Sequence, residues 1–96
     1  MAAQSLAEVR EHIDRIDQQL VALIAERGRW VQQAARFKSD ADAVRAPQRV
    51  EQVIAKVRAL AAEHAADPTV VEAVYRAMIA AFIQAELAEH QRLQQE

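Results

Sequence analysis

The chain has 96 residues, a net charge of −2 and no cysteine, which indicates one small domain without disulfides or a thiolate zinc site. Acidic and basic residues are mixed along the sequence, so no basic face for nucleic acid is expected. No apolar run approaches the roughly 18 residues of a membrane helix, and the first residues lack the pattern of a signal peptide. We therefore expect a single cytoplasmic domain over 1–96, with no membrane segment.

The first predicted element is a long helix from Leu6 to about Lys38. Ser5 and Glu8 form a capping-box pattern at its start, in which the hydroxyl and the carboxylate satisfy free N–H groups of the first turn. One glycine and two prolines in the whole chain favour helix almost everywhere else. The fold class is therefore expected to be all-α.

Two further helices follow a polar segment. A second helix is predicted over 47–64, because Pro47 suits a first turn, and a third over 68–93, with Asp67 as its cap. The segment 39–47 between the first two helices is expected to be a loop that acts as a mobile lid. The sequence thus predicts a three-helix chain with a long first helix.

An apolar stripe on the first helix is broken once. Positions spaced alternately by three and four from Leu6 to Phe37 are apolar at nine of ten places, and the exception is Arg27. A helix of about 34 residues is about 50 Å long, which the shorter second helix cannot cover alone. We therefore expect a homodimer with the long helices at its interface.

Several charged residues lie on or beside core-facing positions. Lys38 follows Arg27 by about three turns and so lies on nearly the same face, whereas about 42 Å of helix separates it from Arg10. Arg10 can therefore approach Lys38 only from a second, antiparallel copy. Arg49 shares a face with apolar residues of the second helix, so its base is expected to point toward the core. Glu86 extends the apolar stripe of the third helix, at steps of four, three and four from Tyr75. These groups either pair as salt bridges or form a pocket for a small polyanion, whose carboxylates arginine binds bidentately.

Three segments resemble those of a known family. "EVREHIDRIDQQLVALIAERGRWVQQAARFK", "VRAPQRV" and "VVEAVYRAMIAAFIQAELAEHQ" are similar to the all-α chorismate mutases over about Leu6–His90. The resemblance implies an intertwined homodimer of three-helix chains that converts chorismate to prephenate without a cofactor or metal. Because that rearrangement is intramolecular, an enzyme helps by holding the reactive conformer and by placing donors at the ether oxygen, where negative charge develops.

The resemblance also implies the roles of individual residues. Arg27 and Arg10 of the partner subunit would hold the two substrate carboxylates, and Lys38 would contact a carboxylate and the ether oxygen. Glu86 stands where the family commonly has a glutamine that hydrogen-bonds to this oxygen, so Lys38 and Glu86 are the expected catalytic residues. The other expected substrate-binding positions are Arg49, Val44 and Ile83.

Two departures from the family pattern leave alternatives open. Ala46 and Val50 are apolar where chorismate mutases usually carry carboxylates for the ring hydroxyl, and "RFKSDADAVRAPQRV" more closely resembles the isochorismate pyruvate lyases, which share the fold. Isochorismate pyruvate lyase is therefore the second hypothesis for the function. Aminodeoxychorismate mutases also fit the fold, and a non-catalytic helical dimerisation module is a further alternative.

The second departure is the carboxyl group of Glu86. An ionised carboxylate cannot donate a hydrogen bond to an ether oxygen, whereas a protonated one can. We therefore expect Glu86 to act in its protonated form and the activity to be greater at acidic pH. The three histidines, His12, His64 and His90, are expected at the surface with no part in the site.

Overall fold

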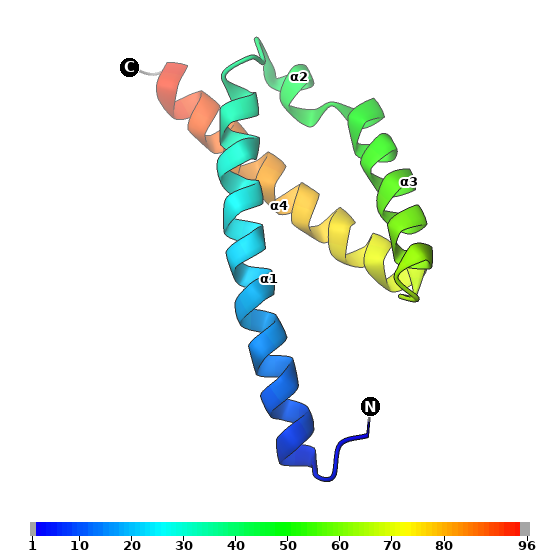
Figure 1. Cartoon of the computed structure of the whole chain (residues 1–96). Coiled ribbons are helices and arrows are strands. Elements are labelled where there is room, and N and C mark those ends of the chain that lie inside the picture. The colour runs from blue at the N-terminus through cyan, green and yellow to red at the C-terminus, as the bar shows by residue number, and fades with distance from the viewer. Residues whose placement is uncertain (1, 95–96) are drawn as a thin grey trace. The chain divides into compact units, whose positions relative to one another are not determined.

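The computed structural model describes residues 2–94, with only the backbone of Gln94, and most of these residues are helical (Figure 1). The helices are α1 (Leu6–Ala35), α2 (Ala41–Arg45), α3 (Pro47–Glu63) and α4 (Pro68–Gln94). Because no strand occurs in the described part of the chain, the predicted all-α class is confirmed. None of these helices is long and apolar enough to cross a membrane. The chain divides into two compact units, 1–33 and 34–96, which are described separately.

Helix α1 begins as predicted but ends earlier. The Ser5 hydroxyl accepts the N–H of Glu8 at 3.1 Å, and the Glu8 carboxylate accepts the N–H of Gln4 at 3.0 Å. The first bond satisfies a donor that the first turn leaves without a helical partner, and the second holds the residue before the cap against the helix. The helix ends at Ala35 instead of about Lys38, because the Lys38 N–H turns back to the Ala35 carbonyl at 3.2 Å.

The apolar stripe of α1 is uncovered in the single chain. Helix α1 has no buried residue, and among its exposed large apolar side chains the exposed fraction runs from 37% at Val9 to 68% at Trp30. An exposed apolar face of this kind is typical of an interaction surface. We call this face the α1 stripe; its exposed members are Leu6, Val9, Ile13, Ile16, Leu20, Leu23 and Trp30.

The segment that was expected to be a loop contains the short helix α2. The Asp40 carboxylate caps this helix by accepting the N–H of Ala43 at 2.8 Å, and Val44 on it is 3% exposed. The helix stops at Ala46, which lies in the left-handed region with φ 38° and ψ 62°. The prediction of a helix-free loop was therefore wrong, because five residues are too few to show a helical period.

Helices α3 and α4 form a hairpin that is the core of the second unit. Both α2 and α3 pack on α4 (Figure 1), and the buried face of α3 consists of Ile54, Val57 and Ala61. Asp67 caps α4 as predicted, since its carboxylate accepts the N–H of Thr69 at 2.9 Å. The predicted starts of both helices are confirmed, and their ends lie within one residue of expectation.

The turn that ends α3 is a Schellman motif. The N–H of Ala66 donates to the carbonyl of Ala61 at 2.8 Å, and that of Ala65 to the carbonyl of Ala62 at 3.3 Å. Ala65 occupies the left-handed position of this motif with φ 56°, where glycine is the usual residue. The motif reverses the chain and brings α4 back against α3.

Candidate functional site

An ion pair joins the turn after α1 to α4. The Nζ atom of Lys38 lies 3.3 Å from Oε2 of Glu86. The side chain of Glu86 is 6% exposed and that of Lys38 is 24% exposed. Glu86 is the one buried charged residue in the described part of the chain. The sequence prediction that Glu86 lies on the core-facing stripe of its helix is therefore confirmed.

Burial makes this pair costly to break. A carboxylate that loses water is destabilised unless a cation and hydrogen bonds replace that water. The Lys38 ammonium supplies this charge and has three N–H donors, of which the contact with Glu86 uses one. The partly exposed lysine therefore keeps donors for an anion or an ether oxygen beside a carboxyl group.

Two apolar residues of the expected site lie in the same unit as this pair. Val44 is buried on α2, which packs on α4, and Ile83 is half-buried on α4, three residues before Glu86. Residues three apart on a helix share a face. Ile83 and Glu86 are therefore neighbours on α4.

The three arginines predicted for the site differ in their exposure and in the unit to which they belong. Arg49 is exposed in the first turn of α3, although a core-directed base was expected for it. Arg10 is exposed and Arg27 half-buried, and both lie on the part of α1 that belongs to the other unit. The ion pair of Lys38 and Glu86 brings two of the expected charged residues into direct contact.

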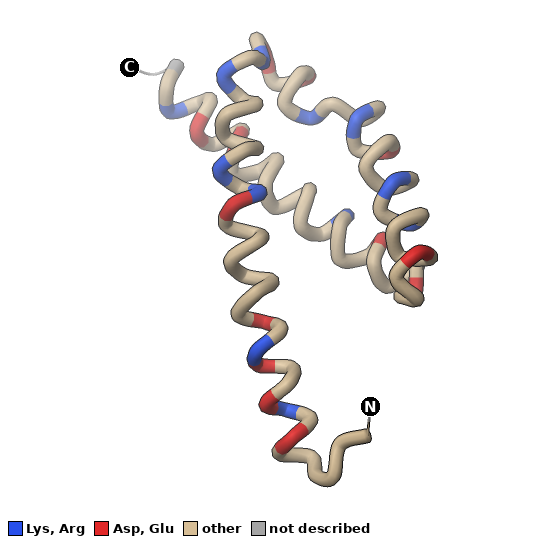
Figure 2. Tube along the Cα trace, viewed as in Figure 1, with Lys and Arg blue, Asp and Glu red and all other residues tan. Residues whose placement is uncertain are grey.

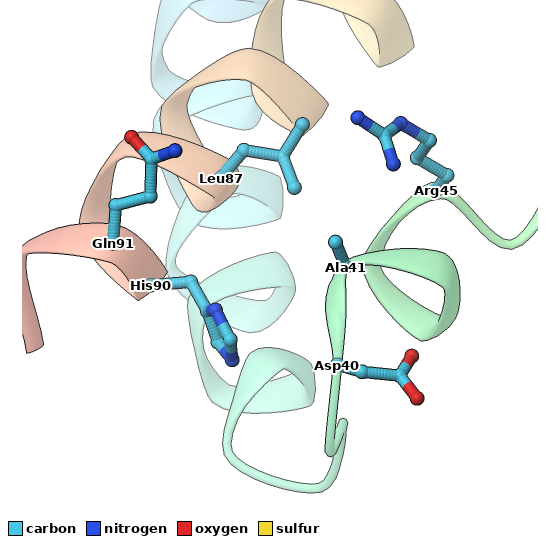
Figure 3. Close-up of a pocket in the computed structure, with 6 residues that line it drawn as sticks. All are labelled: Asp40, Ala41, Arg45, Leu87, His90 and Gln91. Carbon is cyan, nitrogen blue, oxygen red and sulfur yellow. The ribbon is translucent and has the colours of Figure 1, made fainter. Parts of the chain in front are cut away.

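A pocket of about 260 Å³ lies between α2 and the end of α4 (Figure 3). The Arg45 guanidinium points toward Leu87 across Ala41, and the Asp40 carboxylate points away to cap its helix (Figure 3). The lining residues are Asp40, Ala41, Arg45, Leu87, His90 and Gln91. Sequence reasoning missed this pocket and assigned His90 to the surface, whereas its side chain is half-buried. The capping signal of Asp40 before an apolar residue is what could have revealed α2 and hence the pocket.

Charge in the rest of the structure is dispersed. Acidic and basic positions are interspersed along the helices (Figure 2). Within residues 2–94, no group of three His, Asp or Glu side chains is arranged to hold a metal ion.

Comparisons with known proteins agree on one family. The family described as chorismate mutase type II matches residues 9–87. The isochorismate pyruvate lyase of Pseudomonas aeruginosa is 36% identical over 74 residues, which cover 77% of this chain and 73% of that protein. The chorismate mutase of Methanocaldococcus jannaschii is 30% identical over 77 residues, which cover 79% and 78% of the two chains.

Proposed function

The chain belongs to the chorismate mutase type II family, and we propose that it is an enzyme that rearranges chorismate to prephenate. The observation that carries this proposal is the ion pair of Lys38 and Glu86, 3.3 Å apart. A cation and a carboxyl group are in contact and largely shielded from solvent. They occupy the two positions for which the family resemblance predicts contacts with the ether oxygen. The chemistry needs these donors and no nucleophile.

The proposed mechanism is a clamp combined with electrostatic stabilisation. Arg27 and Arg10 of the partner subunit hold the two carboxylates of the compact substrate conformer, with Arg49, Val44 and Ile83 lining the same site. Lys38 and protonated Glu86 donate to the ether oxygen as the carbon–oxygen bond breaks. A preorganised donor at such an oxygen contributes about 100- to 1,000-fold in rate, and the clamp removes the entropy cost of reaching the conformer.

The proposed active form is an intertwined homodimer. The α1 stripe is uncovered in the single chain, with Leu6 and Leu23 each 61% exposed, and a second copy of α1 supplies a matching apolar surface. Antiparallel pairing of two α1 helices brings Arg10 of one chain close to Lys38 of the other. Two equivalent sites result, and residues 1–96 act as a single chorismate mutase-like domain.

Isochorismate pyruvate lyase is the second candidate function. Ala46 and Val50 offer no carboxylate to a ring hydroxyl. The lyase from Pseudomonas aeruginosa also has the higher identity of the two relatives, at 36% against 30%. Both reactions break the bond between the ring and the ether oxygen of a dicarboxylate, so the same clamp and donors serve either one.

Turnover of the two substrates tests the proposal. Purified protein is given chorismate and isochorismate in turn, and the products are identified as prephenate or as salicylate with pyruvate. If conversion of chorismate to prephenate is the more efficient reaction, the result supports the mutase. If formation of salicylate and pyruvate from isochorismate is the more efficient reaction, the lyase replaces the mutase as the function of the protein.

Arg27→Ala separates both enzymes from a non-catalytic dimerisation module. Loss of a charge-assisted contact to a carboxylate predicts a fall in kcat/KM of roughly 100-fold or more, with the folded dimer retained. Arg29→Ala, at an exposed position on the same helix, is the control and is expected to keep its activity. If neither substrate is turned over and Arg27→Ala is neutral or stabilising, the enzyme proposal fails.

A further inference from the structure

A second set of charged side chains joins α3 to α4. Arg76 binds Glu51 bidentately, with Nη1 and Nη2 at 3.0 and 2.9 Å from the two carboxylate oxygens. Its Nε atom donates to Glu72 at 2.7 Å, and Arg58 donates to the other oxygen of Glu72, also at 2.7 Å. We call these four residues, Glu51, Arg58, Glu72 and Arg76, the α3–α4 ladder.

The ladder follows one edge of the helix hairpin. Glu51 and Arg58 are seven residues apart on α3, about two turns, and so share a face. Glu72 and Arg76 are four apart on α4. Because the two helices are antiparallel, the early residue of α3 meets the later residue of α4. The ladder therefore has two rungs between the helices: one joins Glu51 to Arg76 and the other joins Arg58 to Glu72.

Electrostatics supports a persistent ladder. The hydrogen bonds from Arg76 lower the pKa of Glu51 and of Glu72, and the carboxylates raise the pKa of Arg76. Fork-to-fork contacts fix orientation as well as distance, and a network of charges is held more firmly than an isolated surface pair. The ladder therefore connects α3 to α4 through two ion pairs at different levels of the hairpin.

Arg49 lies on the opposite side of α3 from this edge. It precedes Glu51 by two residues, about 200° around the helix. The buried stripe of α3, which includes Ile54 and Val57, lies between the two. A helix held by its apolar face alone is free to roll by small angles, and a roll swings the outer side chains most. An ion-pair ladder along one edge opposes such a roll, and Arg49 lies on the other edge, where a roll displaces side chains most.

We propose that the α3–α4 ladder, through Arg76, is a positioning device that sets the rotation of α3 and thereby aims Arg49 at the substrate. The inference rests on the proposed function in one respect, namely that Arg49 binds the substrate. Arg76 is a positioning residue, since it acts through α3 and touches no reacting atom in this scheme.

The kinetic test compares Arg76→Gln with Arg92→Gln. Arg92 is a matched control, because it also binds a carboxylate, Glu89 at 2.6 Å, but within a single helix. We expect kcat/KM of Arg76→Gln to fall roughly tenfold, with most of the loss in KM, since a misplaced arginine weakens a charge-assisted contact. Glu51→Gln removes the same rung from the other side and is expected to give the same change, whereas Arg92→Gln keeps wild-type kinetics.

A double-mutant cycle separates positioning from general destabilisation. If Arg76 acts through Arg49, Arg76→Gln has no further effect on kcat/KM in an Arg49→Ala background. Additive losses in the double variant, at equal folded fraction in thermal unfolding, overturn the inference.

A measurement without substrate keeps the two proposals distinguishable. Backbone amide NMR shifts of residues 48–50 are expected to change in Arg76→Gln and to stay unchanged in Arg92→Gln, whether or not the protein turns over any substrate. Unchanged shifts in Arg76→Gln overturn the inference about the ladder. Absence of turnover by the wild-type protein overturns the proposed function.

Discussion

The protonation state of Glu86 is the residue-scale feature with the clearest consequence for activity. Its carboxyl group lies 3.3 Å from the Nζ atom of Lys38. A carboxylate accepts hydrogen bonds but cannot donate one to an ether oxygen, whereas a carboxylic acid can. Acid is therefore expected to increase the fraction of the enzyme that carries the required donor.

Glu86→Gln tests this requirement, because an amide of nearly the same size donates a hydrogen bond at every pH. We expect kcat of the wild-type protein to rise as the pH is lowered from neutral, and kcat of Glu86→Gln to be independent of pH over that range. At neutral pH the variant is expected to be faster by up to roughly 100-fold, the effect of one added donor. Identical pH–rate profiles for the two proteins contradict the idea.

The spacing of residues along the helices predicted the burial of one site residue correctly and that of another incorrectly. The steps of four, three and four from Tyr75 to Glu86 placed that carboxyl group on the apolar face of α4, and it is buried. The same reasoning gave Arg49 a core-directed base, yet Arg49 is exposed. The buried stripe of α3 centres on Ile54, Val57 and Ala61, which leaves Arg49 at its edge. Spacing gives the face of a helix, but the partner helix decides which part of that face is covered.

At the scale of elements, the turn between α3 and α4 offers a test of backbone strain. Ala65 has φ 56°, a conformation that costs a residue with a Cβ atom about 1–2 kcal/mol. Glycine removes that cost but has more conformational freedom to lose on folding. Ala65→Gly is therefore expected to stabilise the protein by roughly 0.5–1 kcal/mol, measured as a rise in Tm at fixed protein concentration.

The control for this prediction is Ala59→Gly, at an exposed position inside α3. Glycine in a helix interior costs about 1 kcal/mol, so this variant is expected to lower the Tm. Equal shifts of the same sign in both variants contradict the assignment of strain to Ala65.

Element prediction succeeded where local chemistry marks a helix end. Proline at the first turn and an aspartate or serine cap fixed the starts of α1, α3 and α4, because each satisfies or removes free N–H groups. Helix α2 was missed because its five residues have no apolar period, and because it is held by packing on α4 and by the burial of Val44. Such contacts between distant segments are not visible in a local pattern.

At the scale of the whole molecule, the α1 stripe is the exposed apolar surface that the proposed dimer uses. Ile13 and Leu20 are each 50% exposed, along a helix with no buried residue. In the proposed dimer this face is covered, and each proposed site takes Arg10 from one chain and Arg27 from the other. This proposal predicts that dimerisation and activity are coupled, so dilution below the dimer dissociation constant is expected to abolish both.

Mixing two inactive variants tests this shared site directly. Arg10→Ala and Arg27→Ala are each expected to be inactive alone, since each removes one cation from both sites. In a mixed dimer, one site receives the intact Arg27 of the first variant and the intact Arg10 of the second, while the other site receives neither. Random exchange of subunits is expected to restore roughly a quarter of wild-type activity. No recovery after verified exchange, for example by mass spectrometry of intact dimers, contradicts a site built from two chains.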